Sequence, residues 1–304
     1  VGRIWTDKSV SADDIDLTGA GGTTTIQKGD SDFLTAFSAL SSTSNLRDTV
    51  TTPLDIVLVL DASGSMSDPM GRGDSTKRID ALKAAANSFI DKIAESNGKI
   101  ADESQRHRVS IVKFSGDKTN KVGNDTYRSG RYTYNYSQVM KTMTTVDSTG
   151  ATSLKSSVNS ISPAGSTRAD YGLELASSQL ASNGRPGATK VVVFFTDGAP
   201  TSTNGFESGV ANSAVSAAKS MKDSGTTIYT IGIFSGANPN PADTSGRENS
   251  FMNAVSSNYP NATAYNNLGA RVSADAAYYK TATTSGDLKT LFESISQEIL
   301  ESSG

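Results

Sequence analysis

The chain has 304 residues, of which 36% are hydrophobic and 19% are charged, and its formal net charge is −3. This apolar content is enough for a large folded core, which argues against a disordered chain. The near balance of 28 basic and 31 acidic residues argues against a nucleic-acid-binding protein that works through bulk positive charge.

Some chemistries are excluded because the residues they need are missing. The sequence has no Cys, which removes disulfides and thiolate metal sites, and its only His is His107, which removes multi-His zinc sites. We expect His107 in a solvated loop. No run of 18 or more apolar residues occurs, so we expect no direct insertion into a membrane. The chain begins at Val1 without a recognisable signal peptide, so we expect a processed fragment.

Residues 1–52 differ from the rest of the chain. They contain Gly-rich and Thr-rich runs, the only Trp, and short β-like pieces at 4–5 and 33–40. We interpret them as a β-rich N-terminal extension packed on the main domain, or as part of a flanking β-domain. Lys8 could belong to a Lys–Asn isopeptide cross-link, but the sequence names no partner, and a surface lysine is the simpler reading.

From residue 53 to 304 apolar strands alternate with helical spacing. The pattern predicts strands at 54–60, 108–114, 190–195, 226–234 and, weakly, 278–279, with helices at 79–93, 151–162, 168–182, 206–223, 248–258 and 285–301. Four tyrosines between Tyr127 and Tyr136 indicate a hairpin, and Ser285 is the expected N-cap of the last helix. This order predicts an α/β fold, with a doubly wound, mostly parallel sheet flanked by helices.

Oxygen-bearing side chains follow the ends of two predicted strands. Asp61 ends the first strand, Ser63 and Ser65 follow it, and Asp197 ends the strand at 190–195. Parallel strands end at one edge of the sheet, and Thr167, just before a helix, can bring a third hydroxyl there. Carboxylates with neutral hydroxyls suit Mg²⁺, Mn²⁺ or Ca²⁺ rather than zinc. Simple capping of the strand ends would leave the hydroxyl spacing unexplained.

Three segments in order, LDIVLVLDASGSM, AGSTRADYGLELA and VVVFFTDGAP, resemble the von Willebrand factor A family and its metal-ion-dependent adhesion site. The resemblance covers about residues 54–300 and implies a Rossmann-like fold. It implies that the metal ligands are, in chain order, Asp61, Ser63, Ser65, Thr167 and Asp197, the last often through water. Mg²⁺ is the implied cation, with Mn²⁺ or Ca²⁺ as alternatives. Arg168 departs from the family pattern, which often has a small polar residue there.

A narrower resemblance connects the chain with the A domains of Gram-positive surface adhesins, including pilus-tip proteins. The segments GRIWTDKSV, SALSST and NSFMNAVSSNYPNATAY carry this likeness. It implies an extracellular protein on the bacterial surface, wall-anchored or at a pilus tip. The implied partners are a host extracellular-matrix or cell-surface protein and, as a further option, other pilus subunits.

Arg72, Gly73 and Asp74 form an RGD tripeptide just after the metal-site loop. The tripeptide could bind an integrin, although a match this short also arises by chance. The alternative is a Gly-rich loop in which Asp74 or Ser75 caps the following helix.

The sequence thus predicts a metal-dependent adhesin domain that binds a host or matrix protein through a divalent cation. The alternative is a structural head or spacer of a surface fibre, in which the metal only stabilises the fold. We do not expect an enzyme, because the only candidate base of the histidine type is His107. A phosphatase of the haloacid-dehalogenase type would need a second Asp where the chain has Ser63.

Overall fold

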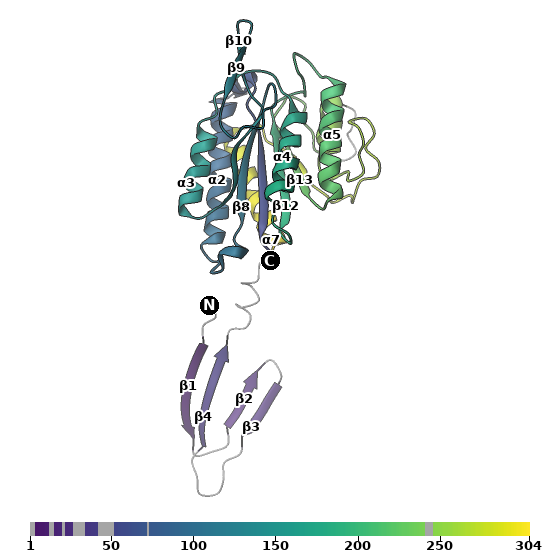
Figure 1. Ribbon diagram of the computed structural model, residues 1–304. Helices are drawn as coiled ribbons and strands as arrows, with labels where there is room; N and C mark the ends of the chain where they lie inside the picture. Colours follow the sequence, from purple (N-terminus) through teal and green to yellow (C-terminus); the bar gives the residue numbers. More distant parts are fainter. Residues whose placement is uncertain are drawn as a thin grey trace. The chain divides into compact units, whose positions relative to one another are not determined.

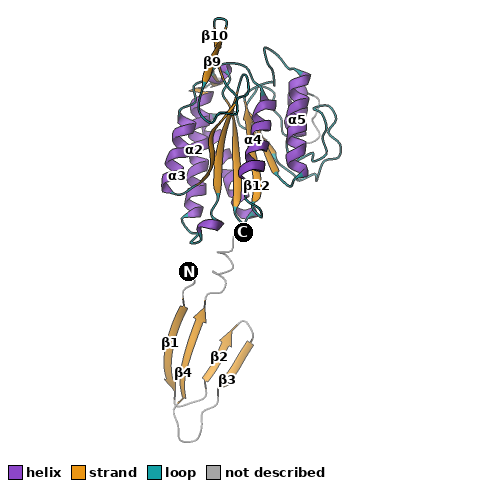
Figure 2. Ribbon diagram, in the orientation of Figure 1, coloured by secondary structure: helices purple, strands orange, loops and turns teal. Residues whose placement is uncertain are grey.

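The computed structural model describes residues 4–11, 15–19, 22–26, 34–41, 52–71, 73–240 and 246–304. The chain divides into two compact units, Val1–Val50 and Thr51–Gly304. Figure 1 traces both units in sequence colours, and Figure 2 separates their helices from their strands.

The described part of the first unit consists of β-strands. Strand β1 (Ile4–Ser11) pairs antiparallel with β4 (Leu34–Ser41), and β2 (Ile15–Gly19) pairs antiparallel with β3 (Gly22–Ile26). The β-rich character is as predicted, but β2 and β3 were not expected because their sequences are polar and rich in Thr. The side chain of Lys8 lies outside the described part of the structure, so a cross-link there stays a prediction.

A six-stranded sheet forms the centre of the second unit. All pairs are parallel except the edge pair of β11 with β8, which is antiparallel. The predicted mostly parallel sheet is therefore confirmed. In spatial order the strands are β11 (Gln138–Thr145), β8 (Arg108–Phe114), β5 (Leu54–Asp61), β12 (Thr189–Thr196), β13 (Thr227–Gly232) and β14 (Tyr279–Thr281).

Helices cover both faces of this sheet (Figure 2). Side chains alternate along each strand, so in β5 Ile56 and Leu58 pack into one hydrophobic core and Val57 and Val59 into the other. The first core is closed by α2 (Arg78–Asn97), α3 (Ser148–Asn159) and α7 (Ser285–Ser302), and the second by α4 (Ala169–Asn183), α5 (Ser208–Asp223) and α6 (Arg247–Val255).

Several short elements decorate the sheet. The tyrosine-rich stretch forms the predicted hairpin, in which β9 (Thr126–Ser129) pairs antiparallel with β10 (Tyr132–Asn135). Strand β11 was not predicted, because its sequence QVMKTMTT is only partly buried at the sheet edge and lacks a continuous apolar run. The short elements are η1 (Gly64–Ser67), β6 (Pro69–Gly71), β7 (Asp74–Lys77), η2 (Glu103–Gln105), β9 (Thr126–Ser129) and β10 (Tyr132–Asn135).

The N-cap of α7 is Thr284, not Ser285 as expected. Thr284 keeps an extended backbone, and its hydroxyl accepts a hydrogen bond from the backbone N–H of Asp287 at 3.0 Å. Either hydroxyl residue could cap the helix on sequence grounds, and the backbone conformation decides between them. Within the described ranges, no helix combines the length and the hydropathy needed to cross a bilayer.

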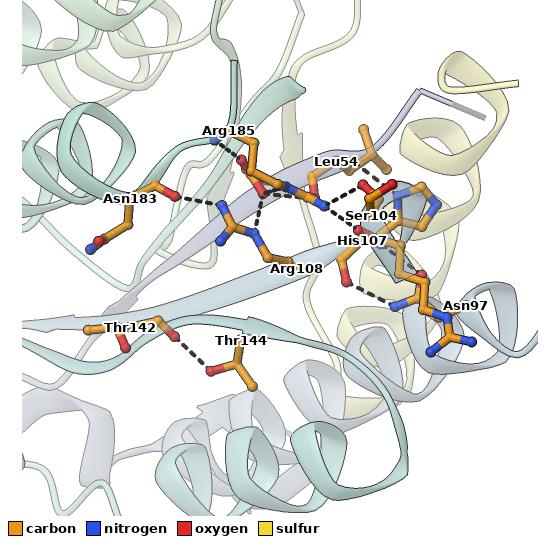
Figure 3. Close-up of polar contacts among 11 residues, drawn as sticks. Leu54, Asn97, Ser104, His107, Arg108, Thr142, Thr144, Asn183 and Arg185 are labelled. Carbon is orange, nitrogen blue, oxygen red and sulfur yellow. Dashed lines mark hydrogen bonds and ion pairs between the residues drawn. The ribbon is translucent and has the colours of Figure 1, made fainter. Parts of the chain in front are cut away.

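An ionic network that includes Arg108 and Arg185 (Figure 3) lies at the start of β5 and β8, at the opposite end of β5 from Asp61. Asp55 is fully buried, and its carboxylate accepts hydrogen bonds from Arg108 Nε at 2.8 Å and from Arg185 Nη2 at 2.9 Å. Burial alone would raise the pKa of Asp55, but the bonds from Arg108 and Arg185 outweigh it and hold that pKa below its usual value.

His107 belongs to the same region and is fully buried, so the expectation of a solvated loop histidine was wrong. Its Nδ1 accepts a hydrogen bond from the backbone N–H of Leu54 at 3.1 Å, which requires a neutral ring. Its Nε2 is buried with no hydrogen-bond partner in the described part of the chain. Burial, assisted by the positive charge of Arg185, lowers the pKa of His107 to about 4.

We expect this histidine to make the fold sensitive to mild acid. Its folded pKa lies below its unfolded value of about 6.5, so stability falls as the pH falls from 6.5 towards 4 and then levels off. Between about pH 7.5 and about pH 4.5 the contribution of His107 to the free energy of unfolding should fall by about 2–3 kcal/mol, seen as a difference from a variant without this titrating ring. Urea denaturation at both pH values measures it.

The variant His107→Asn supplies the control, because an amide oxygen can replace Nδ1 as acceptor without titrating. It should lack this part of the pH dependence. The contribution of Asp55 is lost only at lower pH, as its carboxylate protonates below its usual pKa, and should remain. An equal loss of stability in both proteins over this range would contradict the assignment.

Candidate metal site

The first part of the site is the turn that follows β5. Asp61 is fully buried, and its Oδ1 accepts a hydrogen bond from the backbone N–H of Ser63 at 2.8 Å. Aspartate favours such turns because its short side chain reaches the N–H two residues on. The bond folds the chain back, so the hydroxyls of Ser63 and Ser65 come within 3.1 Å of each other.

The end of β12 closes the site from the neighbouring strand. Thr196 Oγ1 donates to Asp61 Oδ2 at 2.9 Å, and the backbone N–H of Asp197 donates to the same oxygen at 3.2 Å. The carboxylate of Asp197 accepts hydrogen bonds from Ser65 Oγ at 3.0 and 2.8 Å. Asp61, Ser63, Ser65 and Asp197 thus form one hydrogen-bonded cluster, as the strand order predicts.

Thr167 reaches the same edge through backbone contacts. It exchanges two hydrogen bonds with Thr201, in the loop after Asp197, each of 3.0 Å. The carbonyl of Gly165 accepts from Gly64 N–H at 3.1 Å. Gly165 has φ +107°, and a Cβ there would lie 2.3 Å from Ser115 Oγ, so only glycine fits this close approach. All five predicted ligands therefore lie at the end of β5 or on the segments after it that are hydrogen-bonded to one another at this edge.

The electrostatics of this cluster favour a cation. Burial, and then the negative charge of Asp197, raise the pKa of Asp61 well above its usual value. A divalent cation between the carboxylates would relieve this repulsion. No group of three or more His, Cys, Asp or Glu side chains suited to a metal occurs among the described residues. The residues present fit a hard cation such as Mg²⁺, which the two carboxylates and the hydroxyls of Ser63, Ser65 and Thr167 would hold.

Arg78 is an unpredicted member of the site. The first residue of α2, it places its Nη1 2.9 Å from Asp197 Oδ2, and its Nε is buried without a hydrogen-bond partner in the described structure. Nothing in the local sequence distinguished this arginine from an ordinary helix-start residue. Its guanidinium balances part of the negative charge that a metal would otherwise balance.

Arg168, which departs from the family pattern, does not carry a free charge. Its Nε and Nη2 donate to the two carboxylate oxygens of Asp170 at 3.0 and 2.8 Å. Its guanidinium lies 3.7 Å from the centre of the Tyr171 ring. The Arg168 side chain is therefore held by contacts with two residues of α4.

Asn135 is a second residue that the sequence did not reveal. Its buried side-chain amide donates to the carbonyls of Ala62 at 3.1 Å and Ser162 at 2.7 Å, so it joins the Asp61 turn to the loop before Thr167. Its Oδ1 accepts from Lys113 Nζ at 3.0 Å. Burial lowers the pKa of this fully buried lysine to about 8.

The structure describes Gly73 and Asp74 of the RGD tripeptide but not Arg72. The N-cap of α2 is Lys77. The expectation that Asp74 or Ser75 caps this helix was therefore wrong. The Asp74 carboxylate instead accepts from the backbone N–H of Ser285 at 2.7 Å and of Thr76 at 3.1 Å. These bonds lower the pKa of Asp74 to about 2. An integrin role for Arg72, Gly73 and Asp74 stays a prediction.

Comparison with known proteins identifies the family. The sequence model of the von Willebrand factor type A domain matches residues 55–269, so the chain belongs to that family. A search among curated protein sequences gives no significant match.

Solved structures show the same fold at low sequence identity. The pilus adhesin SpaC from Lactobacillus rhamnosus GG aligns with a TM-score of 0.56 and 18% identity over 83% of this chain, which spans only 31% of SpaC. The PilB minor pilin from Streptococcus sanguinis aligns with a TM-score of 0.58 and 15% sequence identity, over 98% of this chain and 79% of PilB. The vWF domain of the type V pili tip protein Mfa5 from Porphyromonas gingivalis aligns with a TM-score of 0.53 and 16% sequence identity, over 84% of this chain and 97% of that domain.

We expect Arg78→Ala to strengthen Mg²⁺ binding, because the guanidinium competes for Asp197 Oδ2. The dissociation constant should fall by up to about tenfold, or about 1.4 kcal/mol. Isothermal titration calorimetry on metal-stripped protein measures it. Lys155→Ala, which removes a surface ion pair with Asp91, is the control and should change nothing. Weaker binding by Arg78→Ala would show that the arginine supports the site.

We expect Asn135→Asp to weaken Mg²⁺ binding at least about tenfold, because a carboxylate keeps the contact with Lys113 but cannot donate to the loop carbonyls. The matched control is Asn124→Asp, which changes the other asparagine bound by Lys113 Nζ. Asn124 donates to Ser160 rather than to the turn after Asp61. Equal effects of the two variants in the same titration would contradict a positioning role for Asn135.

Proposed function

We propose that this domain is an adhesin that binds a host or matrix protein through a divalent cation at the carboxyl edge of its sheet. One observation carries the proposal: two buried carboxylates and three hydroxyl residues from distant parts of the sequence meet at this edge. Burying two like charges side by side is costly, and the single guanidinium of Arg78 beside Asp197 balances only part of the charge. The arrangement is therefore better explained by metal binding than by stability of the loops.

The ligand set also explains how a partner would be recognised. Asp61 and Asp197 would balance the two charges of the cation, and the hydroxyls of Ser63, Ser65 and Thr167 would add none. When bound, the cation would supply an electrophilic position for a carboxylate of the partner. Ser65 is exposed whereas Asp61, Ser63 and Thr167 are buried, so the site opens to solvent beside Ser65.

The same proposal assigns binding rather than catalysis. The only histidine is bonded to Leu54, the first residue of β5, whereas Asp61 is the last residue of that strand. His107 is thus at the wrong end of the sheet to act as a base beside the metal.

We further propose a location on the bacterial surface, at a pilus tip or anchored to the wall, with other pilus subunits as additional partners. The support is the fold shared with SpaC, PilB and the Mfa5 domain, all described as pilus proteins. Mg²⁺ is the proposed resident cation because the donors are few, small and hard.

The test is adhesion of the purified chain to immobilised fibronectin, collagen, laminin and fibrinogen and to cultured epithelial cells. Binding to at least one of these surfaces should require Mg²⁺ and vanish with EDTA. Ser65→Ala should weaken it at least about tenfold, because a ligand oxygen is lost. The matched control is Ser67→Ala, an exposed serine on the same turn of η1, which should bind like the unmodified chain.

Two outcomes would contradict the adhesin proposal. If EDTA lowers the melting temperature but adhesion survives, the metal stabilises the fold only, and the domain is a structural head or spacer. If an RGD peptide competes while Ser65→Ala has no effect, the contact lies at residues 72–74 instead.

A further inference from the structure

The hairpin β9–β10 stands beside the metal edge and has an unusual composition. Its ten residues, 126–135, read TYRSGRYTYN, with three tyrosines, two arginines and no acidic residue. It projects beyond the ends of the sheet strands (Figure 1). Gly130, with φ +63°, allows the tight turn between the two strands.

The base of the hairpin is held in a fixed conformation. The ring of Tyr127 stacks on Tyr134 with centroids 5.5 Å apart, and its hydroxyl accepts from the backbone N–H of Asp117 at 2.9 Å. The last hairpin residue, Asn135, is bonded to the turn that contains Asp61 and Ser63. The hairpin is therefore a preorganised part of the metal edge.

Two hollows flank the hairpin next to the predicted metal ligands. One has a volume of about 500 Å³ and lies between Tyr132 and Tyr134 on one side and Thr203 and Asn204 on the other. The second, of about 180 Å³, lies between Tyr127 and Arg168. Ser166, which precedes the predicted ligand Thr167, lines both. Both hollows therefore lie beside the loop that carries Thr167.

The free charges of the hairpin are positive. Arg128 donates to the carbonyl of Arg131 at 3.3 Å, and the guanidinium of Arg131 lies 6.0 Å from the ring centre of Tyr132. Within the described residues neither arginine forms an ion pair with a carboxylate, unlike Arg168 with Asp170. Tyr132 is 62% exposed, so its ring is available for contact.

Tyrosine, arginine, serine and glycine together are the residues that dominate protein-binding loops, because Tyr and Arg give large contacts at low entropic cost. We propose that the hairpin β9–β10 and its two hollows form the specificity surface for an acidic segment of the protein partner. One carboxylate of that segment would lie at the metal edge, and a second acidic side chain would pair with Arg128 or Arg131. The proposal rests on the metal-dependent adhesion proposed above.

The test selects a phage-displayed library of random dodecapeptides on the whole chain, with Mg²⁺ or with EDTA. The unmodified chain should enrich Mg²⁺-dependent peptides with two acidic positions. The double variant Arg128→Glu and Arg131→Glu should still enrich Mg²⁺-dependent peptides, but with a basic residue at the second position. It should bind synthetic peptides selected by the unmodified chain at least about tenfold more weakly. Tyr132→Ala should weaken the same peptides.

The matched control is the double variant Lys99→Glu and Lys289→Glu, which makes the same change of charge at exposed positions on other parts of the domain. It should select the same peptides as the unmodified chain. Melting temperature and Mg²⁺ affinity, measured on every variant, should stay unchanged and separate hairpin effects from loss of the fold or the metal.

The failures of the two proposals look different. If the unmodified chain selects Mg²⁺-dependent peptides and the hairpin double variant selects the same ones, the hairpin proposal is wrong and the metal-edge proposal stands. If the unmodified chain selects no Mg²⁺-dependent peptide, binding of an acidic protein segment fails as a whole. Mg²⁺-dependent binding to a glycan array with none to peptides would likewise overturn the assignment to a protein segment.

Discussion

The repulsion between two buried carboxylates governs the carboxyl edge of this domain. Asp61 ends β5 and Asp197 directly follows the adjacent parallel strand β12, so the sheet itself brings them together. Thr196, the backbone of Ser63 and the hydroxyl of Ser65 donate neutral hydrogen bonds to them, and the guanidinium of Arg78 beside Asp197 balances only part of their negative charge. A divalent cation bound between the two carboxylates would balance the rest, as the proposal for this edge requires.

A buried polar network holds the loops around this pair in place. Lys113, fully buried at the end of β8, fixes Asn135, and Asn135 fixes both the Asp61 turn and the loop that leads to Thr167. The same asparagine ends the tyrosine-rich hairpin. One side chain thus connects the core of the sheet, the predicted metal site and the surface proposed to select the partner. A buried polar network makes one arrangement of the surrounding chain rigid when every polar group in it has a hydrogen-bond partner.

Much of this arrangement could be predicted from sequence, and the limits have physical causes. Continuous apolar runs identify the central strands, and strand ends in a parallel sheet identify Asp61 and Asp197 as neighbours. The edge strand β11 escaped prediction because edge strands need not be apolar. Asn135 and the buried His107 escaped because their roles depend on distant backbone groups, which leave no local pattern. Asp74 was assigned to the wrong helix for the same reason, since its partner Ser285 is 211 residues away.

The most direct test of the central claim is anomalous diffraction from crystals of the metal-stripped chain soaked in Mn²⁺, which can replace Mg²⁺ at oxygen sites. We predict a strong anomalous peak within bonding distance of the side-chain oxygens of Ser63 and Ser65, beside Asp61, Thr167 and Asp197. The peak should be absent from crystals of Asp61→Ala. An unoccupied edge in the unmodified chain, or an equal peak in the variant, would contradict the account.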